Sequence, residues 1–129
     1  MIQKVILGAM KGDRATPEDK ALVARYIAPH VELTFVGRKL TALDQIGQFN
    51  ATRYKWVKKH MDRWDVTHEG NLTIVSSVGT LYGEWPDGTA FQGNRYLDRF
   101  VLVDGKITRM DVWNDSAELM LLRAGLVKQ

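Results

Sequence analysis

The sequence predicts an α+β domain in which N-terminal helices pack against one face of a strongly curved antiparallel sheet. Up to about His60 the apolar residues recur roughly every 3.6 positions, as in helices, and from Met61 they recur about every 2 positions, as in strands. Asp104-Gly105 lies between two apolar stretches, and this dipeptide is a strong signal for a hairpin of antiparallel strands. The length of 129 residues fits one domain, so we assign residues 1–129 to a single unit.

Two short amphipathic helices are predicted at the start of the chain. The first has apolar residues at helical spacing from Ile2 to Met10 and should end near Gly12. The second begins at Thr16-Pro17-Glu18-Asp19, where a capping hydroxyl, a proline and an acidic residue stand in the order typical of a helix N-terminus. It should end before Pro29, because proline cannot continue a helix.

A strand and a longer helix follow. The segment Val31–Val36 is rich in β-branched and aromatic residues and is closed by Gly37, so we predict a strand. Thr41 and Asp44 supply another helix start, and the apolar residues after them share one helical face to about His60. This third helix is expected to be the longest.

The second half of the chain should form a four-stranded meander. The alternating segments that predict its strands are Met61–Glu69, Leu72–Gly83, Ala90–Val103 and Lys106–Asn114. Asp115-Ser116-Ala117-Glu118 then caps a last amphipathic helix that runs to about Leu126. A curved sheet wrapped on helices leaves a cone-shaped interior.

Composition excludes several classes of function. The chain has no cysteine, so disulfides, thiolate metal sites and a cysteine nucleophile are ruled out. The longest uncharged stretch has about 13 residues, against roughly 20 for a membrane-spanning helix, and no signal-peptide pattern is visible, so we expect a cytoplasmic protein without a membrane partner. The three histidines have no metal-ligand spacing, and no phosphate-binding glycine loop or serine-hydrolase motif occurs. We therefore expect no metal.

A basic cluster in the predicted third helix suggests a nucleic-acid surface at first sight. The net charge is +3, and Arg53, Lys55, Lys58 and Lys59 lie close together with aromatic residues between them. On a helix, however, these lysines project opposite the apolar face, as on any solvated helix. We therefore expect no nucleic-acid partner.

The chain resembles the nuclear-transport-factor-2-like superfamily, in its SnoaL-like and ketosteroid-isomerase-like branch. The segments that carry the resemblance are Gly79–Gly83, Pro86–Thr89, Arg95–Ile107 and Trp113–Asp115. The resemblance implies a cone-shaped fold with an apolar pocket and no cofactor, and its members include isomerases, cyclases, lyases, epoxide hydrolases and non-catalytic binding subunits. The fold therefore does not by itself give the function.

Asp98 is the catalytic candidate that the resemblance implies. It stands where ketosteroid isomerases keep a protonated aspartate and where SnoaL-like cyclases place an acid–base aspartate. Other positions depart from the pattern: Thr34 replaces the proton-shuttling aspartate of the isomerases, Val5 replaces a tyrosine, and Leu81 replaces the histidine of some cyclases. These departures argue against steroid isomerisation by the isomerase mechanism.

The environment of Asp98 depends on the hairpin register. A two-residue loop at Asp104-Gly105 would place Asp98 opposite Asp111, which would make a carboxylate dyad. A three-residue loop with a bulge at Gly105 would instead place Asp98 opposite Met110, alone among apolar groups. We favour the second register, because Arg95 and Arg99 alternate with Asp98 and need the solvated face. Burial there should raise the pKa of Asp98 towards neutrality.

The other residues expected around a ligand are apolar or weakly polar. They are Tyr96, Phe100, Met110, Val112, Asn114, Thr34, Phe49 and Trp64. The first functional hypothesis is a cofactor-free acid–base enzyme of isomerase, cyclase, lyase or hydrolase type, acting on an apolar cyclic or polyketide-like molecule. The second is a non-catalytic small-molecule-binding or protein-interaction module. The resemblance also implies a homodimer, in which Leu97, Val101 and Trp113 would be covered on the outer sheet face.

Overall fold

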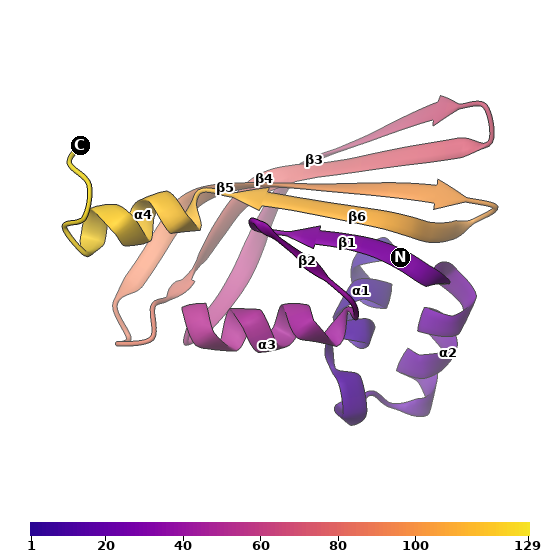
Figure 1. The fold of residues 1–129 in the computed structure, drawn as a ribbon, viewed down its shortest axis with the longest axis horizontal. Coiled ribbons are helices and arrows are strands. Elements are labelled where there is room, and N and C mark those ends of the chain that lie inside the picture. The colour runs from indigo at the N-terminus through magenta and orange to yellow at the C-terminus, as the bar shows by residue number, and fades with distance from the viewer.

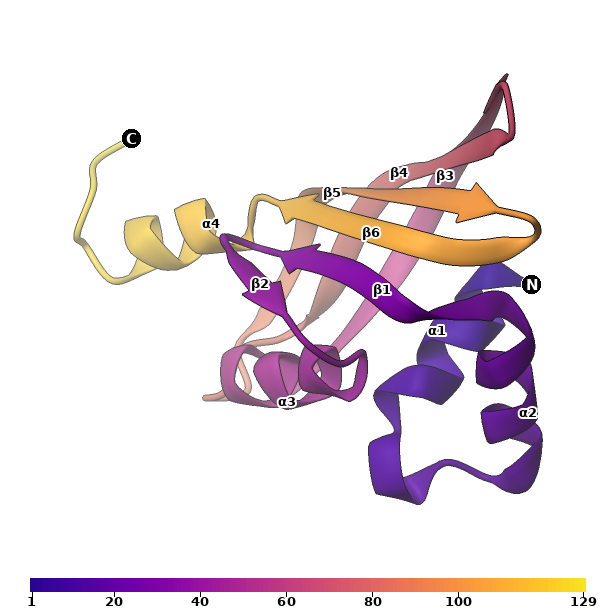
Figure 2. The same ribbon diagram turned by 45° about the vertical axis from the view of Figure 1, so that its right-hand side comes forward.

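A curved sheet of six strands is covered on its concave side by three of the four helices (Figures 1 and 2). The structure, a computed structural model, describes residues 1–129. Its helices are α1 (Ile2–Met10), α2 (Pro17–Tyr26), α3 (Asp44–Arg53) and α4 (Ser116–Arg123), with a 3₁₀ turn at Gly12–Arg14. Its strands are β1 (Ile27–Phe35), β2 (Arg38–Leu40), β3 (Trp56–Glu69), β4 (Leu72–Glu84), β5 (Ala90–Val103) and β6 (Lys106–Asn114). The predicted α+β cone is confirmed.

The strand order is β2-β1-β6-β5-β4-β3. Strands β3 to β6 form the predicted antiparallel meander. The sheet is not purely antiparallel, however, because β1 lies parallel to β6 and pairs antiparallel only with the short β2. The prediction missed this pairing because β1 and β6 are far apart in the sequence, and local pattern carries no signal for their relative direction.

Helix α2 begins where the sequence predicts, with a complete capping box. The backbone N–H of Asp19 donates to Oγ1 of Thr16, and the N–H of Thr16 donates to the Asp19 carboxylate. The helix ends at Tyr26, and β1 starts directly after it, four residues earlier than the predicted strand at Val31. Helix α4 also ends slightly early, at Arg123.

The third helix is shorter than predicted, and this is the largest correction to the fold. It ends at Arg53, and β3 begins at Trp56, so the segment predicted as its last two turns is a strand. Tyr54 fixes this boundary: its backbone is extended, its hydroxyl donates to Oγ of Ser116 at 2.6 Å, and its ring stacks on Trp85 at 5.7 Å. These long-range contacts override the helical spacing of the local sequence.

The apolar core lies between the helices and the concave face of β1, β4, β5 and β6. It is built from residues at alternate strand positions and from the inner faces of the helices: Val5, Ile6, Ile27, Leu33, Phe35, Leu43, Ile46, Val75, Phe100, Ile107, Met110 and Val112. No helix in the structure combines the length and the hydropathy that crossing a bilayer requires. Part of this core, including Phe35, Phe100 and Met110, also forms the wall of a cavity in the cone.

The β5–β6 register matches neither alternative considered for the sequence. The loop is the two-residue one, with Val103 paired to Lys106, but a bulge in β6 near Thr108 then shifts the pairing by one. Asp98 consequently pairs with Val112, not with Met110 or Asp111. Because paired residues share a face, Asp98 faces the concave side and Asp111 pairs with Arg99 on the convex side, so no carboxylate dyad forms.

Candidate functional site

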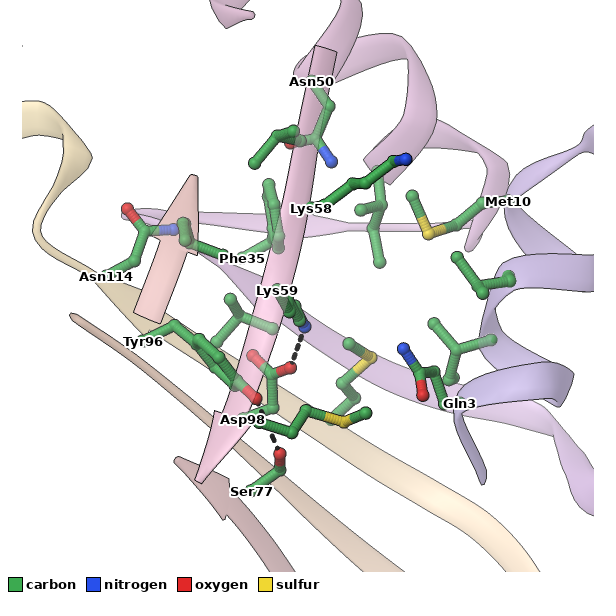
Figure 3. Close-up of a pocket in the computed structure, with 18 of the residues that line it drawn as sticks. Gln3, Met10, Phe35, Asn50, Lys58, Lys59, Ser77, Tyr96, Asp98 and Asn114 are labelled. Atoms are coloured by element: carbon green, nitrogen blue, oxygen red, sulfur yellow. Dashed lines mark hydrogen bonds and ion pairs between the residues drawn. The ribbon is translucent and has the colours of Figure 1, made fainter. Parts of the chain in front are cut away.

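A cavity of about 380 Å³ opens between the concave face of the sheet and helices α1 and α3 (Figure 3). Fifteen of its 22 lining residues are hydrophobic. The polar lining residues are Gln3, Asn50, Lys58, Lys59, Ser77, Asp98 and Asn114. A mostly apolar cavity with a few inward polar groups is the usual form of a small-molecule site.

Asp98 lies deep in this cavity, on β5 between Tyr96 and Phe100. It is only 3% exposed. Its Oδ2 accepts a hydrogen bond from Nζ of Lys59, whereas its Oδ1 is buried and has no hydrogen-bond partner. Desolvation raises the pKa of Asp98 above its ordinary value, and the neighbouring Lys59 ammonium opposes this rise without cancelling it. The carboxyl group therefore gains a proton more readily than a solvated aspartate does.

Lys59 reaches Asp98 from β3, two strands away in the sheet. It pairs with Leu81 of β4, and both residues face the concave side. The Lys59 side chain is 36% exposed, so its ammonium lies at the boundary between the cavity and solvent. The same nitrogen stands 4.5 Å from the centre of the Tyr96 ring, a cation–π arrangement. The cavity thus holds one carboxyl group and one ammonium in direct contact.

Tyr96 and Ser77 form a second polar pair beside Asp98. The Tyr96 hydroxyl lies 3.1 Å from Oγ of Ser77, and both residues are buried. Burial raises the pKa of Tyr96; the hydrogen bond with Ser77 opposes this rise without cancelling it, and the negative charges of Asp98 and Asp62 add to it. The phenol therefore stays protonated and can donate a hydrogen bond.

Amides line the other end of the cavity, at Asn50 of α3 and Asn114 of β6 (Figure 3). Asn114 is held in place because its Oδ1 accepts a hydrogen bond of 3.0 Å from the backbone N–H of Ser116. Behind it, Oγ of Ser116 accepts hydrogen bonds from the Tyr54 hydroxyl and from Nδ2 of Asn94. This buried network joins α4 to β5 and the start of β3, and it makes this end of the cavity rigid.

Seven of the nine site residues that the sequence analysis proposed line the cavity. They are Asp98, Tyr96, Phe100, Met110, Val112, Asn114 and Trp64. Thr34 does not, because it pairs with Asp111 and faces the convex side, and its neighbour Phe35 lines the cavity instead. Phe49 does not line it either: its ring packs edge-on against Phe35 at 5.0 Å and lies beneath the guanidinium groups of Arg38 and Arg53.

Lys59 is the most important residue that the sequence analysis misplaced. It was expected on the solvated face of a helix, but it lies on a strand and contacts Asp98. Val57, Lys59 and Met61 alternate along β3 and all line the cavity. Their sequence carries no signal for this, because Lys59 is polar and the apolar Val57 and Met61 stand four positions apart, as on one face of a helix. The polar residues Asn50 and Ser77 were also missed, because neither stands in a recognisable motif.

No cluster of three or more histidine, aspartate or glutamate side chains with the geometry of a metal site is found in the structure. His60 stacks on the ring of Tyr82 at 4.3 Å, and Nδ1 of His68 lies 3.2 Å from the hydroxyl of Thr73. The chemistry that can be argued from this site is therefore that of Asp98, Lys59 and Tyr96.

Comparisons with known proteins support the fold and do not assign an activity. No protein-family profile matches the sequence, and no curated protein matches it either. Among solved structures, a provisionally assigned ketosteroid isomerase from Shewanella frigidimarina NCIMB 400 aligns with a TM-score of 0.62 and 18% identity, covering 87% of this chain and 90% of that one. A provisionally assigned SnoaL-like polyketide cyclase from Jannaschia sp. CCS1 gives a TM-score of 0.59 and 19% identity over 93% of this chain and 88% of its own.

Two further structures extend the comparison. TerC, co-crystallized with polyporic acid, aligns with a TM-score of 0.60 and 21% identity over 93% of this chain and 95% of its own. An NTF2-like protein of unknown function from Burkholderia pseudomallei K96243 gives a TM-score of 0.61 and 18% identity, covering 95% of this chain and 94% of that one. At these identities the likeness concerns the fold and not the reaction. The chain has the nuclear-transport-factor-2-like cone fold shared by ketosteroid-isomerase-like and SnoaL-like proteins.

Proposed function

We propose that this protein is a cofactor-free enzyme that moves a proton within an apolar cyclic or polyketide-like ketone held in the cone. The observation that carries the proposal is the state of Asp98: a buried carboxyl group in an apolar cavity, in contact with one ammonium, with its other oxygen unpaired. A buried carboxylate without full hydrogen bonding lowers the stability of the fold. Acid–base catalysis would account for such a group, because the same desolvation that destabilises the carboxylate makes it a better base.

The roles of the polar groups follow from their charges. The Asp98 carboxylate removes a proton from the carbon next to the substrate carbonyl, and the electrons of the broken C–H bond move into the carbonyl oxygen to form an enolate. The Lys59 ammonium, or the protonated Tyr96 hydroxyl, donates a hydrogen bond to that oxygen and stabilises its negative charge. Asp98 then returns the proton to the same or another carbon. Isomerisation, cyclisation and elimination all share this first step.

The first step is testable without knowing the natural substrate. We would incubate the protein with apolar ketones, such as 2-tetralone and 2-acetylnaphthalene, in D₂O and follow loss of the α-proton signal by NMR. Asp98→Asn should slow the exchange roughly 10²- to 10⁴-fold, the range for loss of a general base. The matched control is Asp111→Asn, which removes a buried carboxylate that pairs with Arg109 on the convex face. Exchange that is equal in wild type and Asp98→Asn would overturn the proposal.

The second candidate is a non-catalytic binding module with the same cavity. The observation that favours it is that Asp98 is the only carboxyl group among the lining residues. Tight binding of apolar ketones without any Asp98-dependent exchange would support this alternative over the enzyme.

We also propose that two copies of the chain associate through the convex face of the sheet. Trp113 is 54% exposed there, and it pairs with the partly exposed Leu97 of the neighbouring strand. Exposed apolar groups of this size on a sheet face are typical of an interaction surface. An isologous dimer would cover them while leaving both cavities, which open on the concave side, accessible.

A further inference from the structure

Lys59 is the lysine that contacts the buried carboxyl group of the cavity. Its Nζ donates a hydrogen bond to Oδ2 of Asp98 and stands 4.5 Å from the centre of the Tyr96 ring (Figure 3). The cavity lining around this nitrogen is mostly apolar. A hydrophobic pocket and an adjacent acid–base group are two features that activate a lysine as a nucleophile towards a carbonyl carbon.

The hydrogen bond joins Lys59 to a group that can take its proton. Asp98 is 3% exposed, and burial raises the pKa of its carboxyl group. The Lys59 side chain is 36% exposed, so it is the solvated member of the pair. An apolar ligand that fills the cavity removes water from this pair, and the desolvation of two charges can outweigh their mutual attraction. Transfer of the shared proton from Nζ to Oδ2 then leaves a neutral amine with a free electron pair.

We propose that Lys59 condenses with the carbonyl group of a bound apolar aldehyde or ketone to form an iminium ion. This inference rests on the proposed function for the class of ligand, and it adds a covalent intermediate on Lys59. The electron pair of Nζ forms a bond to the carbonyl carbon while the π electrons of the C=O bond move to the oxygen. The carbonyl oxygen later leaves as water, and a C=N bond takes the place of the C=O bond.

Asp98 supplies and removes the protons of this condensation. Its neutral carboxyl group protonates the oxygen of the first adduct, takes a proton from the nitrogen, and gives that proton to the hydroxyl group that leaves as water. The products are an iminium ion, a carboxylate and water, so the site carries the same charges as the original ammonium and carboxylate. The regenerated carboxylate removes a proton from the carbon next to the iminium group, which gives an enamine in place of the enolate. Addition of water reverses the steps and releases the ligand.

Lys58 offers an internal comparison. It precedes Lys59 on β3, and its ammonium lies 5.8 Å from the centre of the Trp56 ring instead of beside Asp98. It therefore lacks the adjacent acid that the condensation needs. Selective reaction at Lys59 over Lys58 would follow from the environment of the amine and not from the residue type.

The test is reductive trapping of the iminium ion. We would incubate the protein with 2-tetralone and sodium cyanoborohydride, whose hydride adds to the iminium carbon and makes the C–N bond permanent. The protein mass should rise by that of one probe molecule less one oxygen atom. Peptide mapping should place the adduct on Lys59, with roughly 10-fold or more labelling over Lys58. Tetralin, which has the same two rings without the carbonyl, should slow the labelling because it competes for the cavity.

Lys59→Arg is the matched variant, because it keeps a positive charge and hydrogen-bond donors for Asp98 but has no amine that can form an imine. It should not be labelled at this position. The control Lys55→Arg changes an exposed lysine outside the cavity in the same way and should be labelled like the wild type.

Three results would overturn the inference: no adduct on the wild type, equal labelling of Lys58 and Lys59, or the same mass increase in Lys59→Arg as in the wild type. The first two are read from the wild type alone, so the test does not depend on the folding of a variant.

This outcome is separable from that of the proposed function, because 2-tetralone also carries exchangeable α-protons. Trapping on Lys59 together with exchange that is equal in wild type and Asp98→Asn would support the inference and contradict the proposed function. Asp98-dependent exchange without trapping would do the opposite.

Discussion

The Lys59 ammonium on the edge strand β3 donates a hydrogen bond to Oδ2 of Asp98 on β5, across the whole width of β4. Two small residues of β4, Ser77 and Gly79, make this contact possible. Ser77 pairs with Asp98 and Gly79 pairs with Tyr96, so neither fills the space above the strand. The acid–base pair thus depends on the sheet topology and on the absence of large side chains between its members.

Lys59→Met should move the pH dependence of proton exchange. The Lys59 charge and its hydrogen bond both lower the pKa of Asp98 relative to what burial alone would give. Exchange requires the Asp98 carboxylate, so its rate rises with pH through that pKa. Loss of Lys59 should shift this rise to higher pH. If Lys59 stabilises the enolate oxygen, its loss should also reduce the maximal exchange rate, the plateau reached at high pH, roughly 10²- to 10³-fold.

The control is Lys55→Met, because Lys55 is exposed and does not line the cavity. It should leave both the pH profile and the plateau unchanged. A Lys59→Met profile that coincides with that of the wild type would show that the ammonium does not act on Asp98 in solution.

Asp98→Asn should change the stability of the protein in a pH-dependent way. The pKa of Asp98 is raised in the folded state, so as pH rises from below about 4 the unfolded chain loses this proton first, and the folded state becomes relatively less stable. The asparagine side chain does not ionise, so the variant does not lose this stability as pH rises. Its free energy of unfolding should therefore increase relative to wild type between pH 3.5 and pH 7, as measured by urea denaturation.

Asp115→Asn should change the free energy of unfolding with pH in the opposite direction. Hydrogen bonds from Arg95 hold the pKa of Asp115 below its usual value, so its contribution to stability is present at neutral pH and is lost as pH falls. This variant should lose stability relative to wild type as pH rises. Parallel curves for the two variants would contradict the assigned environment of Asp98.

The sequence was sufficient to predict most of the fold and the position of Asp98. The change of apolar spacing near Met61 separates helices from sheet, and the alternation around Asp98 places it on the concave face whatever the register. The register itself was not predictable, because the bulge near Thr108 has no glycine or proline to mark it. Thr34 was misplaced for a related reason: which face of β1 is buried depends on its long-range pairing with β6.

Lys59 shows most clearly which features of the site cannot be predicted from the local sequence. The stretch from Tyr54 to His60 is compatible with both a helical and a strand periodicity, and a lysine on either is ordinarily solvated. What decides the structure is Tyr54, whose hydroxyl bonds to Ser116, 62 residues further along the chain. A pattern within a short stretch of sequence cannot predict a contact between residues so far apart in the chain.

Trp113→Glu should convert the proposed dimer to monomers. A charge at this position would be buried without a partner in an isologous interface, where it would occur twice. Sedimentation equilibrium should give twice 14.7 kDa for the wild type and 14.7 kDa for the variant. Leu126→Glu, at an exposed position near the C-terminus, is the control and should remain dimeric. A wild type that sediments as a monomer at micromolar concentration would refute the interface.

Gly79→Ala should damage both stability and proton transfer, because Gly79 lets β3 and Tyr96 approach β4 closely. A Cβ at this position would stand 2.0 Å from the backbone oxygen of His60 and 3.0 Å from Cε1 of Tyr96. The backbone of β3 has to move, which we expect to cost about 1–3 kcal/mol or more of the free energy of unfolding. Lys59 precedes His60 directly, so the same movement displaces its ammonium from Asp98.

Gly83→Ala separates these two effects. Its Cβ would stand 2.1 Å from the backbone oxygen of Trp56, so it should destabilise the same strand pair to a similar degree. Its nearest neighbours are Trp56 and Val57, away from Tyr96, and the contact of Lys59 with Asp98 should be less disturbed. At a temperature where both variants are folded, proton exchange should therefore be slower in Gly79→Ala than in Gly83→Ala. Equal rates in the two variants would mean that the spacing of β3 and β4 at Gly79 does not position the acid–base pair.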